Sequence, residues 1–181
     1  DYEQAATHAT SRTSAPWGRS PDDLYILYTG GTTGMPKGVM WRQDDLIVVL
    51  SSGLGLSVPE TYDPDFVAGA LTRPGPVQMP AWPLMHGTGA LTAFGALTSG
   101  GSIVCLESRH FDPDELLDTI DRERVNVIAI VGDAFAKPIL AALDAEPDRW
   151  SLDSVMAFVS SGVMWSEGTK QGMLGINRRC C

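Results

Sequence analysis

Short apolar runs of strand length alternate with amphipathic stretches of helix length in the second half of the chain. Residues 125–132 form a nearly continuous apolar run, which is typical of a strand buried on both faces of a parallel sheet. The predicted series is strand, helix, strand, helix, strand, over residues 102–107, 112–123, 125–132, 135–143 and 154–159. This alternation predicts an α/β fold in which a partial, largely parallel sheet is flanked by helices.

The helix predicted over residues 112–123 has the clearest start signal. Asp112 can cap it, Pro113 suits its first position, and Glu115 stands where a capping box places an acid. Its apolar side chains share one face and are expected in the core: Leu116, Leu117 and Ile120.

The first half of the chain is less regular. Residues 24–29 are rich in aromatic and β-branched side chains and predict a buried strand. We expect a helix over residues 44–50, a strand over 77–82, and a helix of small residues from Gly89 to the glycines at 100–101.

The domain organisation is expected to have three parts. Residues 1–22 are polar and contain Pro and Gly, as in a linker or a frayed segment, and residues 23–171 form a partial domain. Residues 172–181, which end in Arg-Arg-Cys-Cys, form an atypical tail of the kind that a shifted reading frame can produce. The chain also begins without Met, and we expect it to be an internal fragment of a larger protein.

Composition and charge narrow the classes of partner. The 181 residues are 44% hydrophobic and 19% charged, with a net charge of −9, as in a globular domain. An acidic surface repels nucleic acid and anionic lipid, so neither is an expected partner. No run approaches the ~20 apolar residues of a transmembrane helix. The three cysteines form no paired framework or metal-ligand spacing, which fits a reducing, cytoplasmic setting.

The sharpest chemical signal is YTGGTTGMPKG, from Tyr28 to Gly38. Its glycines let the backbone approach an oxygen-rich ligand, its threonines add hydroxyl groups, and its lysine supplies a cation for phosphate. On a chain of net charge −9, this concentration of anion-binding groups stands apart from its surroundings. The residues expected to bind phosphate are Thr29, Gly30, Gly31, Thr32, Thr33, Gly34 and Lys37.

The spacing of this motif differs from that of two common nucleotide-binding loops. A Walker loop requires Gly-Lys-Ser/Thr at its end, and a dinucleotide fold requires GxGxxG, and the motif has neither. A Gly/Thr hairpin with an exposed lysine and no ligand is the structural alternative to a phosphate loop.

The motif resembles the signature loop of the adenylate-forming enzymes, the superfamily of acyl-CoA synthetases, peptide-synthetase adenylation domains and luciferases. That loop commonly reads YTSGTTGxPKG and holds the pyrophosphate end of ATP, and the departure here is Gly30 in place of Ser. The resemblance runs from about Asp22 to Gln171 and implies part of the large N-terminal domain of such an enzyme.

Two further segments support the resemblance. Residues 83–89, PLMHGTG, are similar to the family's PLxHxxG stretch, whose His86 equivalent lies near the acyl pocket and the ATP phosphates. Residues 160–163, SSGV, stand where the family has a small-residue turn that lines the acyl and adenine pockets, so Gly162 is expected in the substrate pocket. Taken alone, a single histidine or a strand-ending turn is more often structural.

The resemblance implies an AMP-forming acid–thiol ligase that uses ATP, Mg²⁺ and CoA and acts on a carboxylic acid, with a fatty acid the expected substrate. His86 is the one candidate catalytic residue, and no residue of the chain is expected to bind a metal. The family's YGxTE-like segment, its ribose-binding Asp and its C-terminal Lys are absent from these residues, so this fragment alone is expected to be inactive. Two alternatives remain open: a catalytically dead remnant with at most weak nucleotide binding, and a fragment of a peptide-synthetase adenylation domain.

The remaining candidate side chains are predicted to have structural roles. Cys105 is expected as a buried thiol in a strand, and the tryptophans as packing residues. The acidic cluster at the start of the helix is expected to cap it and to face water rather than bind a cation: Asp112, Asp114, Glu115 and Asp118.

Overall fold

The computed structural model describes residues 16–30, 34–52, 63, 65, 68–69, 72 and 74–179. The chain divides into two compact units, residues 1–46 and 47–181, and each is described by itself.

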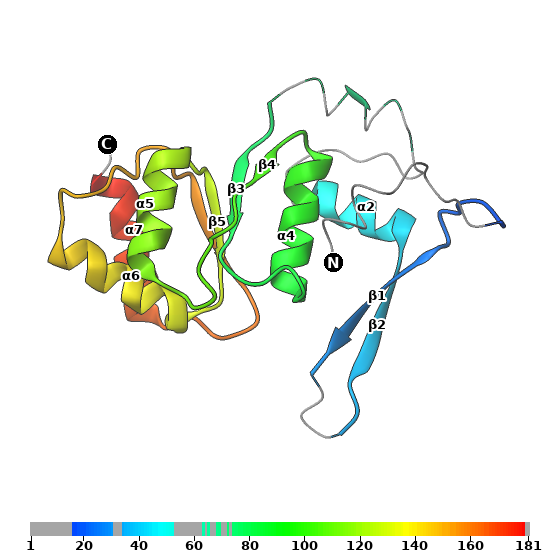
Figure 1. The fold of residues 1–181 in the computed structure, drawn as a ribbon, viewed down its shortest axis with the longest axis horizontal. Coiled ribbons are helices and arrows are strands. Elements are labelled where there is room, and N and C mark those ends of the chain that lie inside the picture. Colours follow the sequence, from blue (N-terminus) through cyan, green and yellow to red (C-terminus); the bar gives the residue numbers. More distant parts are fainter. Residues whose placement is uncertain are drawn as a thin grey trace. The chain divides into compact units, whose positions relative to one another are not determined.

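The first unit is built on a β-hairpin. Strand β1 (Leu24–Thr29) pairs antiparallel with β2 (Lys37–Arg42), and α2 (Gln43–Ser52) begins directly after the hairpin (Figure 1). The Arg42 guanidinium joins Asp22, at 2.6 Å, to Asp45, at 3.1 Å, and so links the turn before β1 to the start of α2.

The expectation that β1 is buried is wrong. Leu24 and Ile26 are 51% and 46% exposed. Among the described residues of its unit, no further layer covers the faces of this two-stranded ribbon, so its apolar side chains meet solvent there.

The second unit contains a four-stranded parallel sheet, which confirms the predicted α/β fold. Its strands lie in the order β4-β3-β5-β6, and all three pairings are parallel. Their bounds are Val77–Pro80 for β3, Ser102–Ile103 for β4, Val127–Ile130 for β5 and Ala157–Ser160 for β6.

Strand β4 is shorter than the sequence predicted. After Val104 donates to the Gln78 carbonyl, the chain leaves the sheet. The amides of Glu107 and Ser108 donate instead to one carboxylate oxygen of Glu115, at 2.7 and 3.1 Å. These bonds lower the pKa of Glu115, and they fold the segment back onto the start of the next helix.

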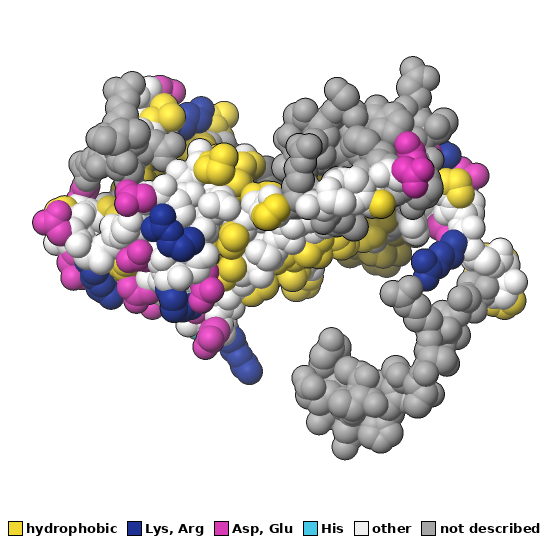
Figure 2. Space-filling model, turned by 90° about the horizontal axis from the view of Figure 1, so that it is seen from above, with side chains coloured by type: hydrophobic (Ala, Val, Ile, Leu, Met, Phe, Trp, Pro, Cys, Tyr) yellow, Lys and Arg dark blue, Asp and Glu magenta, His cyan; other side chains and the backbone are white. Residues whose placement is uncertain are grey.

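Helices cover both faces of this sheet (Figure 1). Helix α4 (Gly87–Thr98) packs on one face, and α5 (Pro113–Glu123), α6 (Asp133–Ala145) and α7 (Glu167–Arg179) lie on the other. Asp112 caps α5 as predicted, accepting from the Asp114 amide at 2.9 Å. Acidic and basic side chains are interspersed on the solvent side of the α5–α7 layer, at the left of Figure 2.

Helix α7 was not predicted, and it runs through residue 172, where the sequence suggested an atypical tail. Its glycines give it weak intrinsic helix propensity. Tertiary packing stabilises α7 instead. Met173 and Ile176 are buried, and a Cβ on Gly172 would come within 2.7 Å of Leu140.

The core lies between the sheet and the α5–α7 layer. The predicted inner face of α5 is confirmed, since its three predicted residues have no exposed surface. The largest fully buried side chains are Met79, Leu116, Leu117, Ile120, Val125, Ile128, Ile130 and Ile139.

Asp133 anchors the segment that leads into α7. One of its oxygens accepts from the Ser166 amide at 3.0 Å, and the other pairs with Lys137 at 3.0 Å. These contacts, the Ser166 amide first, lower the pKa of Asp133 from 3.8 to about 2. The ionised carboxylate therefore stabilises the folded chain.

We predict that Leu116→Ala destabilises the chain by about 2–5 kcal/mol, because it removes a fully buried side chain and leaves a cavity. Leu97→Ala, on the half-exposed surface of α4, is the matched control, with an expected loss of about 0.5 kcal/mol or less. Denaturant unfolding measures both, and equal losses would contradict the assignment of the core.

We predict that Asp133→Asn lowers stability at neutral pH and that its difference from the unmutated chain shrinks as pH falls from about 4 to about 2. A folded-state pKa below the unfolded value gives stability that is present above the unfolded pKa and is lost on protonation. Denaturant midpoints measured across this pH range test the prediction. Asp153→Asn is the control, because Asp153 is exposed and its carboxylate has no bonded partner among the described residues. A difference that is independent of pH would refute this role for Asp133.

Candidate functional site

The Gly/Thr-rich motif forms the tip of the hairpin in the first unit. Thr29 ends β1 and Lys37 begins β2, and the two residues are register partners. The Thr29 hydroxyl donates to the Lys37 carbonyl at 3.2 Å. In this conformation its proton is used in a hydrogen bond across the hairpin. Gly31, Thr32 and Thr33 lie outside the described residues.

In the described part of this tip, an exposed lysine lies beside glycine backbone. Lys37 is exposed and forms no ion pair with the described residues. Among the described residues, no atom lies within 4 Å of the position of a Cβ on Gly30 or Gly34, and Gly34 has a φ of +144°, which favours glycine. Such a tip can bind an anionic group through its lysine and its amides.

His86 stands at the start of α4 in the second unit, beyond the end of β3. It occupies the N-cap position with extended backbone, but its side chain makes no capping bond. The imidazole is exposed and lies beside Trp82, with ring centroids 5.3 Å apart. The start of α4 is closely packed, since a Cβ on Gly89 would come within 2.8 Å of the carbonyl oxygens of Trp82 and Pro83. An uncommitted imidazole on a fixed helix start is suited to meet a ligand.

Gly162 follows β6 with a φ of +84°, in the left-handed region that favours glycine. The preceding Ser161 bonds to Thr88 of α4, with the two hydroxyl oxygens 2.6 Å apart. Ser160 Oγ accepts from the amide of Gly132, just beyond β5, at 2.9 Å. The structure thus brings the predicted residues His86 and Gly162 to the same carboxyl edge of the parallel sheet, where α/β folds commonly bind ligands.

Sequence reasoning missed Thr88 and Ser161 as members of this edge. Both lie inside segments that the sequence singled out, PLMHGTG and SSGV. Their contact joins residues 73 positions apart, which local patterns do not show.

An open cleft of about 800 Å³ lies beside His86. Aromatic side chains form one side of it: the Phe135 ring lies 5.4 Å from Trp82 and 4.3 Å from Phe111, measured between ring centroids. Arg109 and His110, both exposed, also line the cleft. Its apolar wall and basic residues suit a ligand with an apolar part and an anionic part.

The segment that carries Arg109 corrects one expectation. Cys105 is exposed and lies outside the short strand β4, so it is not the buried strand thiol that the sequence predicted. The physical reason is that the chain leaves the sheet after Val104, where the Glu115 carboxylate captures the amides that follow.

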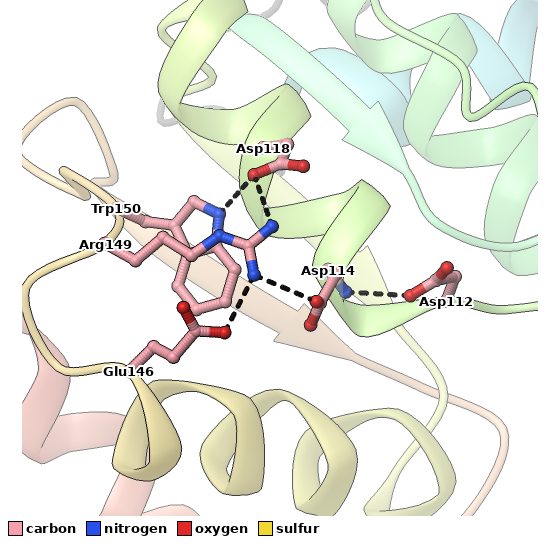
Figure 3. Close-up of polar contacts among 6 residues, drawn as sticks. All are labelled: Asp112, Asp114, Asp118, Glu146, Arg149 and Trp150. Atoms are coloured by element: carbon pink, nitrogen blue, oxygen red, sulfur yellow. Dashed lines mark hydrogen bonds and ion pairs between the residues drawn. The ribbon is translucent and has the colours of Figure 1, made fainter.

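The acidic cluster of α5 has a structural role that the sequence showed only in part. Asp114 and Asp118 face Arg149, whose guanidinium also pairs with Glu146 at 2.8 Å and lies over the Trp150 ring at 4.4 Å (Figure 3). Trp150 donates its ring N–H to Asp118. These aspartates therefore do more than face water: they connect α5 to the segment that follows α6.

The described residues do not gather a metal site. No group of three or more His, Cys, Asp or Glu side chains among them could hold a metal ion. We assign no ligand and no step to the Mg²⁺ that the family resemblance implies.

The comparisons with known proteins agree with one another. The family model described as AMP-binding enzyme matches residues 2–178. The medium-chain acyl-CoA ligase Mig of Mycobacterium avium is 36% identical over 179 residues, which are 97% of this chain and 32% of that protein. A 3-oxocholest-4-en-26-oate–CoA ligase of Rhodococcus rhodochrous is 38% identical over 164 residues, 87% of this chain and 29% of that protein.

Solved structures share the fold. The inhibitor-bound N-terminal domain of FACL13 from Mycobacterium tuberculosis matches with a TM-score of 0.69 and 21% identity, over 97% of this chain and 39% of that one. The O-succinylbenzoate CoA synthetase MenE of Bacillus subtilis, in complex with AMP, matches with a TM-score of 0.68 and 21% identity, over 97% and 40%.

The chain thus spans about a third of the length of the curated relatives it matches. The match of the family model covers nearly every residue, including the hairpin motif and the carboxyl edge of the sheet. This protein therefore belongs to the AMP-binding enzyme family, and its second unit has the α/β fold found in the N-terminal domains of adenylate-forming enzymes.

Proposed function

We propose that the chain is part of an AMP-forming acyl-CoA synthetase that activates a fatty or other largely apolar carboxylic acid. An oxygen of the acid attacks the α-phosphorus of ATP, the bond between the α- and β-phosphates breaks, and pyrophosphate leaves. The thiol of CoA then displaces AMP from the acyl-adenylate, losing its proton as the thioester forms.

The observation that carries the proposal is the presence in one chain of a lysine-bearing Gly/Thr hairpin tip and an aromatic-walled cleft beside His86. The first suits the phosphates of ATP, and the second suits an apolar acid. The names of the relatives, which include a medium-chain acyl-CoA ligase and a sterol-acid CoA ligase, support an acid of this kind.

The proposed roles follow from the chemistry of each residue. Lys37 neutralises phosphate charge, and the amides and hydroxyls from Thr29 to Gly34 hold the phosphate oxygens. His86 and Gly162 contact the acyl substrate at the carboxyl edge of the sheet. A cytoplasmic setting and a fatty-acid substrate belong to the same proposal. No helix in the described part of the chain has the length and apolar character to cross a membrane.

The two alternatives differ from this proposal in what they predict. A remnant would fold without exchanging pyrophosphate. A peptide-synthetase adenylation domain would exchange pyrophosphate when supplied with an amino acid and would not transfer the product to CoA.

We predict that Lys37→Ala slows carboxylate-dependent exchange of pyrophosphate into ATP by about ten- to hundredfold, because it removes a charge-assisted contact to phosphate. The assay uses this chain and the full reading frame that contains it, with medium- and long-chain fatty acids and with amino acids as substrates.

Lys170→Ala is the matched control, since Lys170 is an exposed lysine of α7 in the other unit. Equal slowing by both variants would contradict a phosphate role for Lys37. A folded protein with no exchange on any acid would favour the remnant.

A further inference from the structure

Two hydroxyl groups connect the start of α4 to the turn after β6. Thr88 is the second residue of α4, and Ser161 is the first residue beyond β6. Their oxygens lie 2.6 Å apart, which is short for a bond between neutral hydroxyls. The bond spans 73 positions of sequence and joins the two segments that carry His86 and Gly162.

Each side of this bond is fixed by contacts of its own. On the α4 side, the His86 amide donates to the Pro83 carbonyl at 3.0 Å, and Gly89 packs against the same turn. On the β6 side, Ser160 Oγ accepts from the Gly132 amide, which ties the turn to the end of β5. The hydroxyl bond joins these two segments through their side chains.

The pair also keeps hydrogen-bonding capacity for a ligand. Two hydroxyls carry two protons, and their mutual bond uses one, so the other remains available. Ser161 is exposed and Thr88 is half-buried, so the pair is accessible. Among the described residues, the amides at the start of α4 have no acceptor: Gly87, Thr88 and Gly89.

Gly162 lies beside the two hydroxyl groups, at the carboxyl edge of the sheet. A Cβ placed there would lie 4.0 Å from the Thr88 hydroxyl oxygen and 3.7 Å from Val131. These are ordinary van der Waals distances, so the positive φ of Gly162 and not a lack of space favours glycine there.

We propose that Thr88 and Ser161 are a positioning pair that clasps α4 to the β6 turn and so fixes the site in which the acyl substrate is held. This inference rests on the proposed function. Loss of this bond lets the start of α4 and the turn after β6 separate. Binding of the acid then weakens, and the selectivity of the enzyme for chain length broadens. The lysine-bearing hairpin belongs to the other unit and is not part of the clasp.

The kinetic test compares Thr88→Val, Ser161→Ala and the double variant in the full reading frame, using acid-dependent pyrophosphate exchange. Each single variant is expected to raise the KM for the acid about two- to tenfold, with kcat unchanged. The double variant is expected to be no worse than the singles, because both remove the same bond. Thr88→Ser keeps the hydroxyl and is expected to restore the KM. Thr98→Val, which removes a hydroxyl bonded only within α4, is the matched control.

A second measurement does not depend on activity. Denaturant unfolding of the unmutated protein, the two single variants and the double variant is expected to show losses of stability in the singles that do not add in the double. Additive losses would show that the two hydroxyls act separately and would overturn the clasp.

The outcomes separate the two proposals. An active enzyme whose acid KM is unchanged in these variants overturns the positioning role alone. An inactive unmutated protein overturns the proposed function and the substrate role with it, and the unfolding data then show only whether the bond exists.

Discussion

The second unit depends on the burial of β5 from both sides. Ile128, Ala129 and Ile130 have no exposed surface, and a strand with apolar side chains on both faces must be covered on both. Helices α4 and α5–α7 provide that cover, and the crossover connections that place them make every pairing of the sheet parallel. The layer arrangement is thus a consequence of one strand's composition.

Parallel pairing also determines where functional side chains can lie close together. The carboxyl ends of β3, β5 and β6 all lie at one edge, so the segments that follow them meet there. His86, Gly132 and the pair Thr88–Ser161 come from three such segments. Elsewhere the polar contacts hold the scaffold: Glu115 turns the chain out of β4, and Arg149 connects α5 to the segment after α6.

The division into two units has a consequence for the proposed chemistry. The hairpin that carries Lys37 and the edge that carries His86 belong to different units of the chain. The residues proposed to bind phosphate and those proposed to bind the acid can therefore be substituted separately. The family match covers both, which indicates that both belong to one enzyme architecture.

The sequence by itself determined the series of strands and helices between residues 102 and 160, the inner face of α5, the Asp112 cap and the family to which the chain belongs. These features depend on local periodicity, on the capping residue and on a contiguous motif. Each of these signals comes from residues that are close together in the sequence. Only the tertiary structure decided the exposure of β1, the early end of β4, the helix α7 and the bond between Thr88 and Ser161. Each of these features depends on a partner distant in sequence or on the lack of a covering layer among the described residues. Glu115 binds the amides after β4, and Leu140 packs against Gly172 of α7, whose intrinsic helix propensity is weak. Such contacts form only after the chain has folded, so no local pattern contains them.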